Sequence, residues 1–437
     1  MYEIWVYVYE KGREMKVKIY PSRCSGEIKI PSSKSMGHRA IICASLANGK
    51  SIISNIDYSD DIIATIEGMK KLGAKIECEK DRLIIQGIEN FKNFEENSVI
   101  DCNESGSTLR FFIPIFSLTG KKIIFTGKNR LLKRPQKIYE KIFKEQNLYY
   151  YSDENKLEIK GKIRANEYFI DGNISSQFIS GLLFTLPLLE KDSIININPP
   201  FESASYIDLT IEVLKEFGVS IEKITPLKFK IMGNQKYINK DYEVEGDFSQ
   251  LAFFAVLGAL NNNLRCVGLS HNSKQGDKEI LNILNKSGIK IEKISNGYII
   301  YKGDPQGCEI DLGDCPDLGP ILNILAMYGK GEFKIFNAGR LRLKESDRIL
   351  AMEEELKKLG VEIKATADSI YIKGSETYLG GIELFGHKDH RIVMSLAIAG
   401  TMLEKPIIID GAEAIEKSYP KFFEDLKKLN IKMEYLK

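Results

Sequence analysis

The stretch MKKLGAKIE at residues 69–77 decides how this chain is organised, because close copies of it recur along the whole sequence. Each copy joins a helix end rich in lysine to a strand-like alternation through one Gly or Asn, the residues that adopt the left-handed conformation of a helix C-terminus at low cost. Successive copies lie 70 to 74 residues apart, which predicts six repeats of one supersecondary unit. The turn residues are Gly73, Asn147, Gly218, Gly288, Gly360 and Asn430.

A strand-like segment that ends in glycine follows five of these turns, which predicts a β-hairpin after each. The sixth turn, at Asn430, is followed by too few residues for a complete hairpin. The alternating segment 16–20, KVKIY, is our candidate for the missing strand, so we expect the N-terminal segment to pack in the same domain as the C-terminus. The five segments are DRLIIQG, NKLEIKG, LKFKIMG, GYIIYKG and SIYIKG.

A polar loop that enters a strongly apolar helix lies 38 to 43 residues before each turn. The apolar segments, such as AFFAVLGAL at 252–260, are hydrophobic on nearly all sides, which predicts core helices. A second, amphipathic helix lies between each loop and its turn, so the unit reads β-α-β-α-β-β. The polar anchors of the loops are Ser35, Ser107, Ser176, Ser249, Asp317 and His390.

One such unit cannot bury its own apolar faces, and 437 residues exceed a single hydrophobic core. We therefore expect an α/β (α+β) fold of two globular domains with three units each. The expected boundaries put 15–31 plus 246–437 in domain one and 32–245 in domain two. Residues 1–14 hold the only Trp, and they are either an extra strand or an extension that precedes a start at Met15.

Composition excludes several classes of protein. The net charge of +2 argues against a nucleic-acid binder, which usually carries a clear basic excess. Seven cysteines without a C-x-x-C pair indicate free thiols in a reducing compartment. The sequence has no apolar run of 18 residues and no signal peptide, so we expect a cytoplasmic protein without a membrane partner.

The polar loops carry a consistent excess of cations. Equivalent units would point their helix N-termini the same way, so two facing domains would direct these ends into one cleft that attracts anions. The segment 31–40, PSSKSMGHRA, begins such a helix with basic residues, which the helix dipole disfavours unless an anion binds there. The candidate cations are Lys34, Arg39, Arg130, Arg348, Arg391 and Lys417; Asp317 and Glu345 are the carboxylates, and Ser175, Ser176, Gln177, Ser203 and Tyr206 add polar donors.

Metal and nucleotide sites are not predicted. The segment 387–390, HKDH, lacks a third ligand nearby in the sequence, and the chain has only four His. No G-x-G-x-x-G or G-x-x-x-x-G-K-[ST] loop is present.

At these residues the chain resembles the EPSP synthase family, the 3-phosphoshikimate 1-carboxyvinyltransferases. The family fold has two domains of three β-α-β-α-β-β units with the active site between them, in agreement with the repeats. The resemblance runs from about Met15 to Lys437 in the family order. The motifs are GEIKIPSSKSMGHRA, ESGSTLRFF, GKNRLLKRP, DGNISSQF, VEGDFSQLAFF, NSKQGD, RLRLKESDR and KDHR.

The resemblance implies transfer of the enolpyruvyl group of phosphoenolpyruvate to the 5-hydroxyl of shikimate 3-phosphate, a step of aromatic amino acid biosynthesis, by a monomer without metal or organic cofactor. Asp317 resembles the base for the hydroxyl, and Glu345 the acid toward the methylene carbon, with Lys34 as its partner or rival. The implied shikimate 3-phosphate ligands are Lys34, Ser35, Arg39, Ser175, Ser176, Gln177, Ser203, Tyr206, Asp317 and Lys344. The implied phosphoenolpyruvate ligands are Lys34, Gly106, Arg130, Gln177, Arg348, Arg391 and Lys417, and a second tier holds His390, Glu104, Ser107 and Arg340.

The chain departs from the family at two of these positions. Glu104 stands where many members have Asn near phosphoenolpyruvate, and its carboxylate would repel that ligand unless a cation neutralises it. Arg340 stands where some members have Asn facing the shikimate ring. Gly106 leaves room beside the phosphoenolpyruvate site, which implies inhibition by glyphosate.

Two alternatives remain open. An enolpyruvyl transferase acting on UDP-N-acetylglucosamine has a similar fold, but its family loop carries a Cys before RP and an Asn after the opening Lys. Here the loop is GKNRLLKRP, and Ser35 follows Lys34. The other alternative is a non-catalytic anion-binding protein on the same scaffold.

Overall fold

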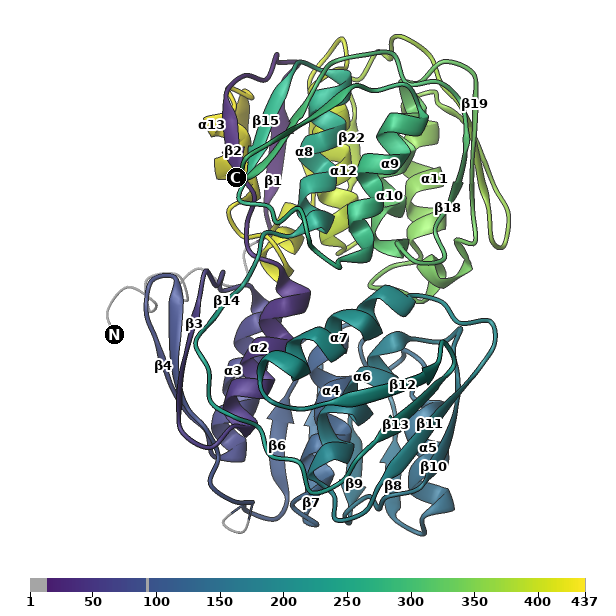
Figure 1. The fold of residues 1–437 in the computed structure, drawn as a ribbon. Helices are drawn as coiled ribbons and strands as arrows, with labels where there is room; N and C mark the ends of the chain where they lie inside the picture. Colours follow the sequence, from purple (N-terminus) through teal and green to yellow (C-terminus); the bar gives the residue numbers. More distant parts are fainter. Residues whose placement is uncertain (1–13, 92–93, 437) are drawn as a thin grey trace.

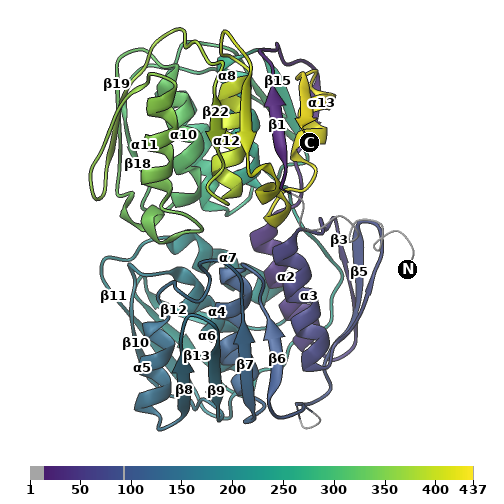
Figure 2. The same ribbon diagram turned by 180° about the vertical axis from the view of Figure 1, so that it is seen from behind.

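The computed structural model describes residues 14–91 and 94–436 as two globular α/β bodies stacked end to end (Figure 1). In each body the sheets lie on the outside, while some helices lie inside and others are visible at the surface in the front and rear views (Figure 2). The buried apolar residues fall into two clusters. We use domain one for the body whose cluster contains Val17 and Ile431, and domain two for the body whose cluster runs from Met36 to Val244. The two-domain α/β fold is as predicted; the expectation for residues 1–13 lies outside the described residues.

Domain two contains three sheets of four strands within the described residues. In each, the first two strands of the order are parallel, and the other neighbours are antiparallel. The sheets are, in spatial order, β14 (Tyr242–Glu243), β3 (Lys50–Ser54), β5 (Arg82–Gln86), β4 (Lys75–Cys78); β6 (Ser98–Asp101), β7 (Lys122–Thr126), β9 (Leu157–Lys160), β8 (Tyr149–Ser152); and β10 (Glu167–Asp171), β11 (Ser193–Asn198), β13 (Lys228–Ile231), β12 (Ile221–Thr225).

Domain one repeats this pattern. Its third sheet places the N-terminal strand between the last two strands of the chain, antiparallel to both, which confirms that segment 16–20 completes the sixth unit. The sheets are β2 (Glu27–Lys29), β15 (Leu264–Val267), β17 (Gly297–Ile300), β16 (Ile291–Ile294); β18 (Glu309–Asp311), β19 (Glu332–Phe336), β21 (Ile370–Lys373), β20 (Glu362–Ala365); and β22 (Glu383–Phe385), β23 (Ile407–Asp410), β1 (Lys16–Ile19), β24 (Met433–Leu436).

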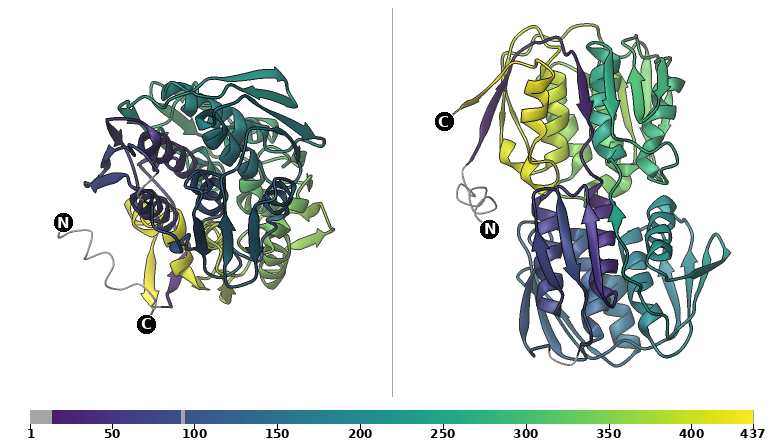
Figure 3. Two further views of the ribbon diagram at one scale, coloured as in Figure 1. Left: turned by 90° about the horizontal axis from the view of Figure 1, so that it is seen from below. Right: turned by 60° about the vertical axis from the view of Figure 1, so that its left-hand side comes forward.

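The chain crosses between the domains twice, and the crossings exchange one strand. Strand β2 precedes the first unit but pairs with β15 in domain one, whereas β14 precedes the fourth unit but pairs with β3 in domain two. The two crossing segments meet in a bridge between Ser32 and Gly246, and they run side by side in Figure 3.

Six helices form the inner layer and are buried over nearly their whole length, as their apolar sequences predict. Serine or aspartate side chains cap the N-termini of five of them. The inner helices are α2 (Lys34–Leu46), α4 (Gly106–Ser117), α6 (Ser176–Thr185), α8 (Phe248–Leu260), α10 (Gly319–Met327) and α12 (His390–Gly400).

The second helix of each unit is amphipathic and is followed by the predicted turn. All six turn residues have positive φ, from 56° at Asn147 to 117° at Gly73, so the predicted left-handed ends are confirmed. These helices are α3 (Asp60–Leu72), α5 (Lys137–Glu145), α7 (Ala204–Glu216), α9 (Glu279–Lys286), α11 (Arg348–Lys358) and α13 (Phe422–Lys428). Short 3₁₀ turns are η1 (Leu186–Leu188), η2 (Gly276–Lys278), η3 (Pro316–Leu318), η4 (Gly339–Leu343) and η5 (Ala412–Lys417).

Candidate active site

The N-termini of inner helices from both domains meet where the domains face each other. Helices α2, α4 and α6 approach from domain two, and α10, α12 and the start of α11 from domain one (Figure 1). The unpaired N–H groups at these ends make the interface electropositive. The charged side chains of the site lie on these ends, on η3 and η5, and in the loops that precede α4, α5 and α11.

Asp317 on η3 lies among three cations. Its Oδ1 is 3.1 Å from Arg348 Nη1 and 3.2 Å from Lys344 Nζ, and its Oδ2 is 3.0 Å from Arg391 Nη2. Burial alone would raise the pKa of this carboxyl, but the three cations hold the pKa well below its usual range. Asp317 is therefore ionised and held in one orientation.

Arg348, the first residue of α11, has a fully buried guanidinium group that bridges three carboxylates. It donates from Nε to Asp389 Oδ2 at 2.8 Å and from Nη2 to Glu345 Oε2 at 2.8 Å, besides its contact with Asp317. Burial opposes its charge, but these anions raise the pKa of Arg348 above its ordinary value. Asp389 also caps α12, so one ion pair joins the start of α11 to the start of α12.

Glu345 contacts cations of both domains. Its Oε1 lies 3.2 Å from Arg134 Nη2 of domain two and 3.3 Å from Lys417 Nζ of domain one. Lys417 in turn reaches Glu104 of domain two at 3.2 Å. Although burial disfavours its charge, Lys417, Arg134 and Arg348 hold the pKa of Glu345 well below its usual range.

The pKa of Glu104 is shifted in the opposite direction from that of Glu345. Burial raises the pKa of its carboxyl, and Lys417 compensates only in part. A carboxylate at position 104, where many members of the family have Asn, needs a cation to neutralise it. Lys417 is that cation, but it is shared with Glu345.

Lys34 begins α2 and points its ammonium group at Asp61 of α3, 2.7 Å away. The backbone N–H of Lys34 donates to Asp247, the cap of α8 in domain one. Burial opposes ionisation of Asp61, but Lys34 keeps the pKa of this carboxyl below its ordinary value. Lys34 is therefore fixed at the boundary between the domains.

Polar donors of domain two form one connected group. Gln177 donates from Nε2 to Ser107 Oγ at 3.0 Å and accepts from Arg110 Nη1 at 2.8 Å. Arg110 also donates to Ser175 Oγ at 3.3 Å, and burial followed by the charge of Arg134 lowers the pKa of Arg110 to about 9. A Cβ at Gly106 would lie 2.9 Å from Arg134 Nη1, so glycine lets this arginine approach.

The opposite end of the interface has further contacts between the domains, and two predicted site residues, Ser203 and Tyr206, take part in them. Ser203, at φ 55°, accepts a hydrogen bond from Arg340 Nη1 at 2.7 Å. The Tyr206 hydroxyl donates to Asp277 Oδ2 at 3.1 Å, and Ser249 Oγ donates to the same oxygen. Ser35 lines a small cavity beside Tyr206 and Asp277.

Most of the predicted site residues come together at this interface, but Arg130 and Arg39 lie apart from the central charges. Arg130 is exposed on the rim of a cleft of about 410 Å³, and Arg134 is the cation beside Glu345. Arg39 is buried within domain two, where it donates to Thr210 Oγ1 at 2.8 Å. His390 lies beside the central charges, with its Nδ1 3.8 Å from Asp389 Oδ1, and burial lowers its pKa so far that the imidazole is neutral. Ser176 is buried beside its neighbours at the start of α6.

Sequence reasoning missed four residues that position the site: Arg110, Arg134, Asp61 and Asp389. Arg110 and Arg134 lie within the motifs ESGSTLRFF and GKNRLLKRP, so the sequence motifs could have identified both as candidate site residues. Asp61 follows Lys34 by 27 residues, and nothing in the local pattern links the two.

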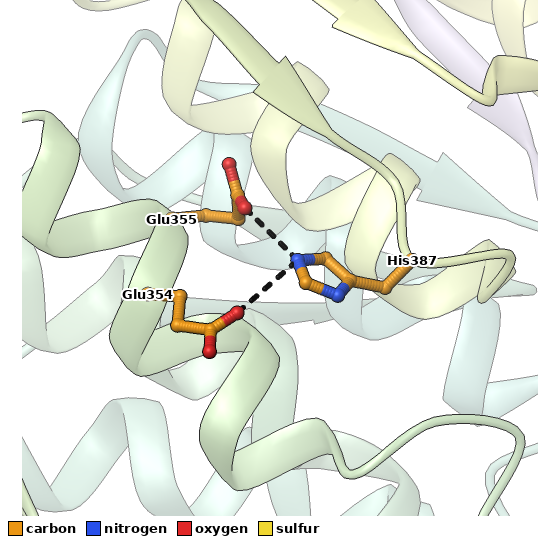
Figure 4. Close-up of side chains that lie close together, drawn as sticks. All are labelled: Glu354, Glu355 and His387. Atoms are coloured by element: carbon orange, nitrogen blue, oxygen red, sulfur yellow. Dashed lines mark hydrogen bonds and ion pairs between the residues drawn. The ribbon is translucent and has the colours of Figure 1, made fainter.

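Two carboxylates that are not close to His387 in the sequence lie beside its imidazole. Helix α11 brings Glu354 and Glu355 there (Figure 4). No helix of the described residues has the length and apolarity required to cross a membrane.

The chain matches the family model of EPSP synthase (3-phosphoshikimate 1-carboxyvinyltransferase) over residues 19–426. It is 51% identical to a 3-phosphoshikimate 1-carboxyvinyltransferase of Clostridium perfringens over 417 residues, which is 95% of this chain and 98% of the relative. It is 49% identical to the protein of that name from Clostridioides difficile, over 94% of this chain and 97% of the relative.

Solved structures agree with these sequence matches. An EPSP synthase from Acinetobacter baumannii superposes with a TM-score of 0.80 at 25% identity, over 97% of this chain and 100% of the other. The enolpyruvyl transferase NikO from Streptomyces tendae superposes with a TM-score of 0.79 over 97% of this chain and 99% of the other, and at 14% identity it shows the shared fold alone.

The environment of Asp277 predicts a pH dependence of stability. Burial, reinforced by the charge of Asp317, raises the pKa of Asp277 to about 6 from an ordinary value of 3.8. The folded state therefore holds this proton more tightly than the unfolded state, so the stabilisation is complete below about pH 4 and is lost as pH rises through about 6. Asp277→Asn lacks this carboxyl, so it should not show this loss of stability. The free energy of unfolding of the variant minus that of the parent should therefore increase by up to about 3 kcal/mol between pH 4 and pH 7.5.

Urea denaturation at both pH values measures this difference. Asp314→Asn makes the same change at an exposed position and is the control. The same pH dependence in Asp277→Asn as in the parent would contradict the prediction.

Proposed function

The chain belongs to the EPSP synthase family, and from this premise we propose that its interdomain site transfers the enolpyruvyl group of phosphoenolpyruvate to the 5-hydroxyl of shikimate 3-phosphate and releases phosphate. One observation supports the proposal above the others. Cations from both domains surround two ionised carboxylates, Asp317 and Glu345, at converging helix N-termini. Such a site suits two substrates that carry phosphate and carboxylate groups.

Asp317 is the proposed base for the 5-hydroxyl. It is ionised, as a base must be, but its three cationic partners make it a weak one. Substrate anions compete for Arg391, Lys344 and Arg348, and each cation that turns to a substrate raises the proton affinity of Asp317. Substrate binding thereby activates the base.

Glu345 is the proposed acid toward the methylene carbon, and Lys34 is its partner or rival. Glu345 is ionised in this structure, so it must first gain a proton. The phosphate and carboxylate of phosphoenolpyruvate would draw Lys417 and Arg348 away from it, which raises its pKa. Lys34, whose ammonium group pairs with Asp61 at 2.7 Å, is the alternative source of that proton.

The remaining residues bind and orient the substrates. Arginine offers two parallel donors to a phosphate or carboxylate, and contact between the domains excludes water from the reacting atoms. The proposed ligands of shikimate 3-phosphate are Lys34, Ser35, Arg39, Ser175, Ser176, Gln177, Ser203, Tyr206 and Lys344. Those of phosphoenolpyruvate are Lys34, Gly106, Arg130, Gln177, Arg348, Arg391 and Lys417, with Arg134 added from the geometry.

We also propose that the protein acts as a monomer in the cytoplasm. The proposed ligands come from two domains of one chain, so no second copy is needed to complete the site. All seven cysteines are free, which suits a reducing compartment.

Phosphate release from phosphoenolpyruvate tests the reaction, with shikimate 3-phosphate and UDP-N-acetylglucosamine offered separately. We expect release with shikimate 3-phosphate alone. Release with the nucleotide sugar alone would assign the other transferase activity, and release with neither would leave an anion-binding scaffold.

Asp317→Asn should lower kcat by about 10²- to 10⁴-fold, because the amide keeps the shape of the side chain but cannot accept the hydroxyl proton. Steady-state kinetics for both substrates measures the loss. Asp314→Asn, three residues before Asp317 and just ahead of η3, is the matched control and should retain the parent kcat. A kcat for Asp317→Asn within threefold of the parent would exclude Asp317 as the base.

Glu104→Asn should lower the KM for phosphoenolpyruvate about three- to tenfold, because it removes a carboxylate that occupies Lys417 and repels the ligand. The KM for shikimate 3-phosphate should stay unchanged. Glu202→Gln, which removes a carboxylate from the opposite end of the interface beside Arg340, is the control and should leave the KM for phosphoenolpyruvate as it is. An unchanged or higher KM for phosphoenolpyruvate in Glu104→Asn would contradict the electrostatic argument.

A further inference from the structure

We propose that Glu354, Glu355 and His387 form a binding site for a divalent transition metal ion of the zinc type. The three side chains come from α11 and from the loop between β22 and α12, and none of them belongs to the proposed reaction chemistry. The site would bind the ion whether or not the chain transfers an enolpyruvyl group.

The three donor atoms have the spacing of a metal site. Nε2 of His387 lies 2.9 Å from Glu355 Oε1 and 4.0 Å from Glu354 Oε2, and all three atoms lie within 4.8 Å of one another. Ligands held 2.0–2.2 Å from one zinc ion in tetrahedral geometry are about 3.4 Å apart. The two carboxylates face the same ring nitrogen (Figure 4).

A hydrogen bond explains only half of this arrangement. Nε2 carries at most one proton, so it can donate to one carboxylate, and the distance of 4.0 Å to Glu354 is too long for a hydrogen bond. Glu355 already accepts from Lys358 at 2.8 Å on both oxygens and from the backbone N–H of Phe385 at 3.0 Å. A bound cation gives the nitrogen and both carboxylates a common partner.

An ion can reach this position from solvent. Glu354 and His387 line the cleft of about 410 Å³, so a water molecule can fill the fourth coordination position from that side. Lys358 competes for Glu355, but its side chain is 47% exposed and can turn away when the ion enters. One imidazole and two carboxylates form a donor set that suits zinc and its neighbours among the transition metals.

The bound ion would join two segments that the candidate active site also joins. Helix α11 begins at Arg348, and the loop that carries His387 leads to Asp389, the ion-pair partner of Arg348. An ion bound only by the folded state raises its stability by mass action. We therefore expect zinc to increase the thermal stability of the protein.

Calorimetric titration of the full chain with ZnCl₂ tests the site, and a titration with CoCl₂ adds the absorption spectrum of the coordinated ion. We expect one zinc ion per chain with a Kd in the micromolar range. Glu354→Gln and His387→Ala should each weaken binding at least about tenfold and remove the zinc-dependent rise in Tm. Glu354 is half exposed, so its variant is expected to fold normally.

Glu353→Gln is the matched control, because it makes the same change on the preceding residue, which pairs with Lys357. It should bind zinc like the parent. Absence of binding up to about 1 mM zinc would overturn the proposal. Binding that Glu354→Gln and His387→Ala leave unchanged would place the ion elsewhere, for example on cysteine thiolates, and would overturn it equally.

Discussion

The buried guanidinium group of Arg348 is the charge on which the interdomain site depends. Removing a charge from water is costly, and a buried cation is tolerated only when anions surround it. Arg348 meets this condition through Asp389, Asp317 and Glu345. Since these residues start α12, lie on η3 and precede α11, one side chain fixes the relative positions of three segments of domain one.

The same interaction sets the chemical state of the site. Asp317 and Glu345 offset the mutual repulsion of the cations around them, and the cations keep both carboxyls ionised. In the proposed reaction the substrate anions take over part of that role. The carboxylates then lose cationic partners and gain proton affinity at the moment when proton transfer is needed. The charge balance thus couples substrate binding to the acid and base chemistry.

Much of the fold follows from local chemistry. A left-handed turn needs Gly or Asn whatever surrounds it, so Gly73 and Asn147 mark helix ends from the sequence alone. Helices that are apolar on all sides must be buried, as α8 is, and the alternation in segment 16–20 has to be a half-buried strand. The repeat spacing then assigns that strand to the unit that lacks one.

The site is predictable only in part. The sequence indicates that Lys34, Arg348 and Arg391 lie at helix starts, because helix starts are local. It does not reveal which arginine of GKNRLLKRP reaches Glu345, since that depends on how the segment before α5 is oriented against domain one, and the structure favours Arg134 over Arg130. The roles of the individual site residues stay predictions that the proposed variants address.

The sequence by itself determined the six units, their turns, their buried helices and the family, because each of these depends on short-range patterns. Only the tertiary structure decided which charges meet. Lys34 with Asp61, Glu104 with Lys417, and Glu354 with His387 are pairs that the packing of separate helices and loops creates. A Coulomb interaction depends on distance in space, and chain spacings of 27, 313 and 33 residues carry no information about that distance.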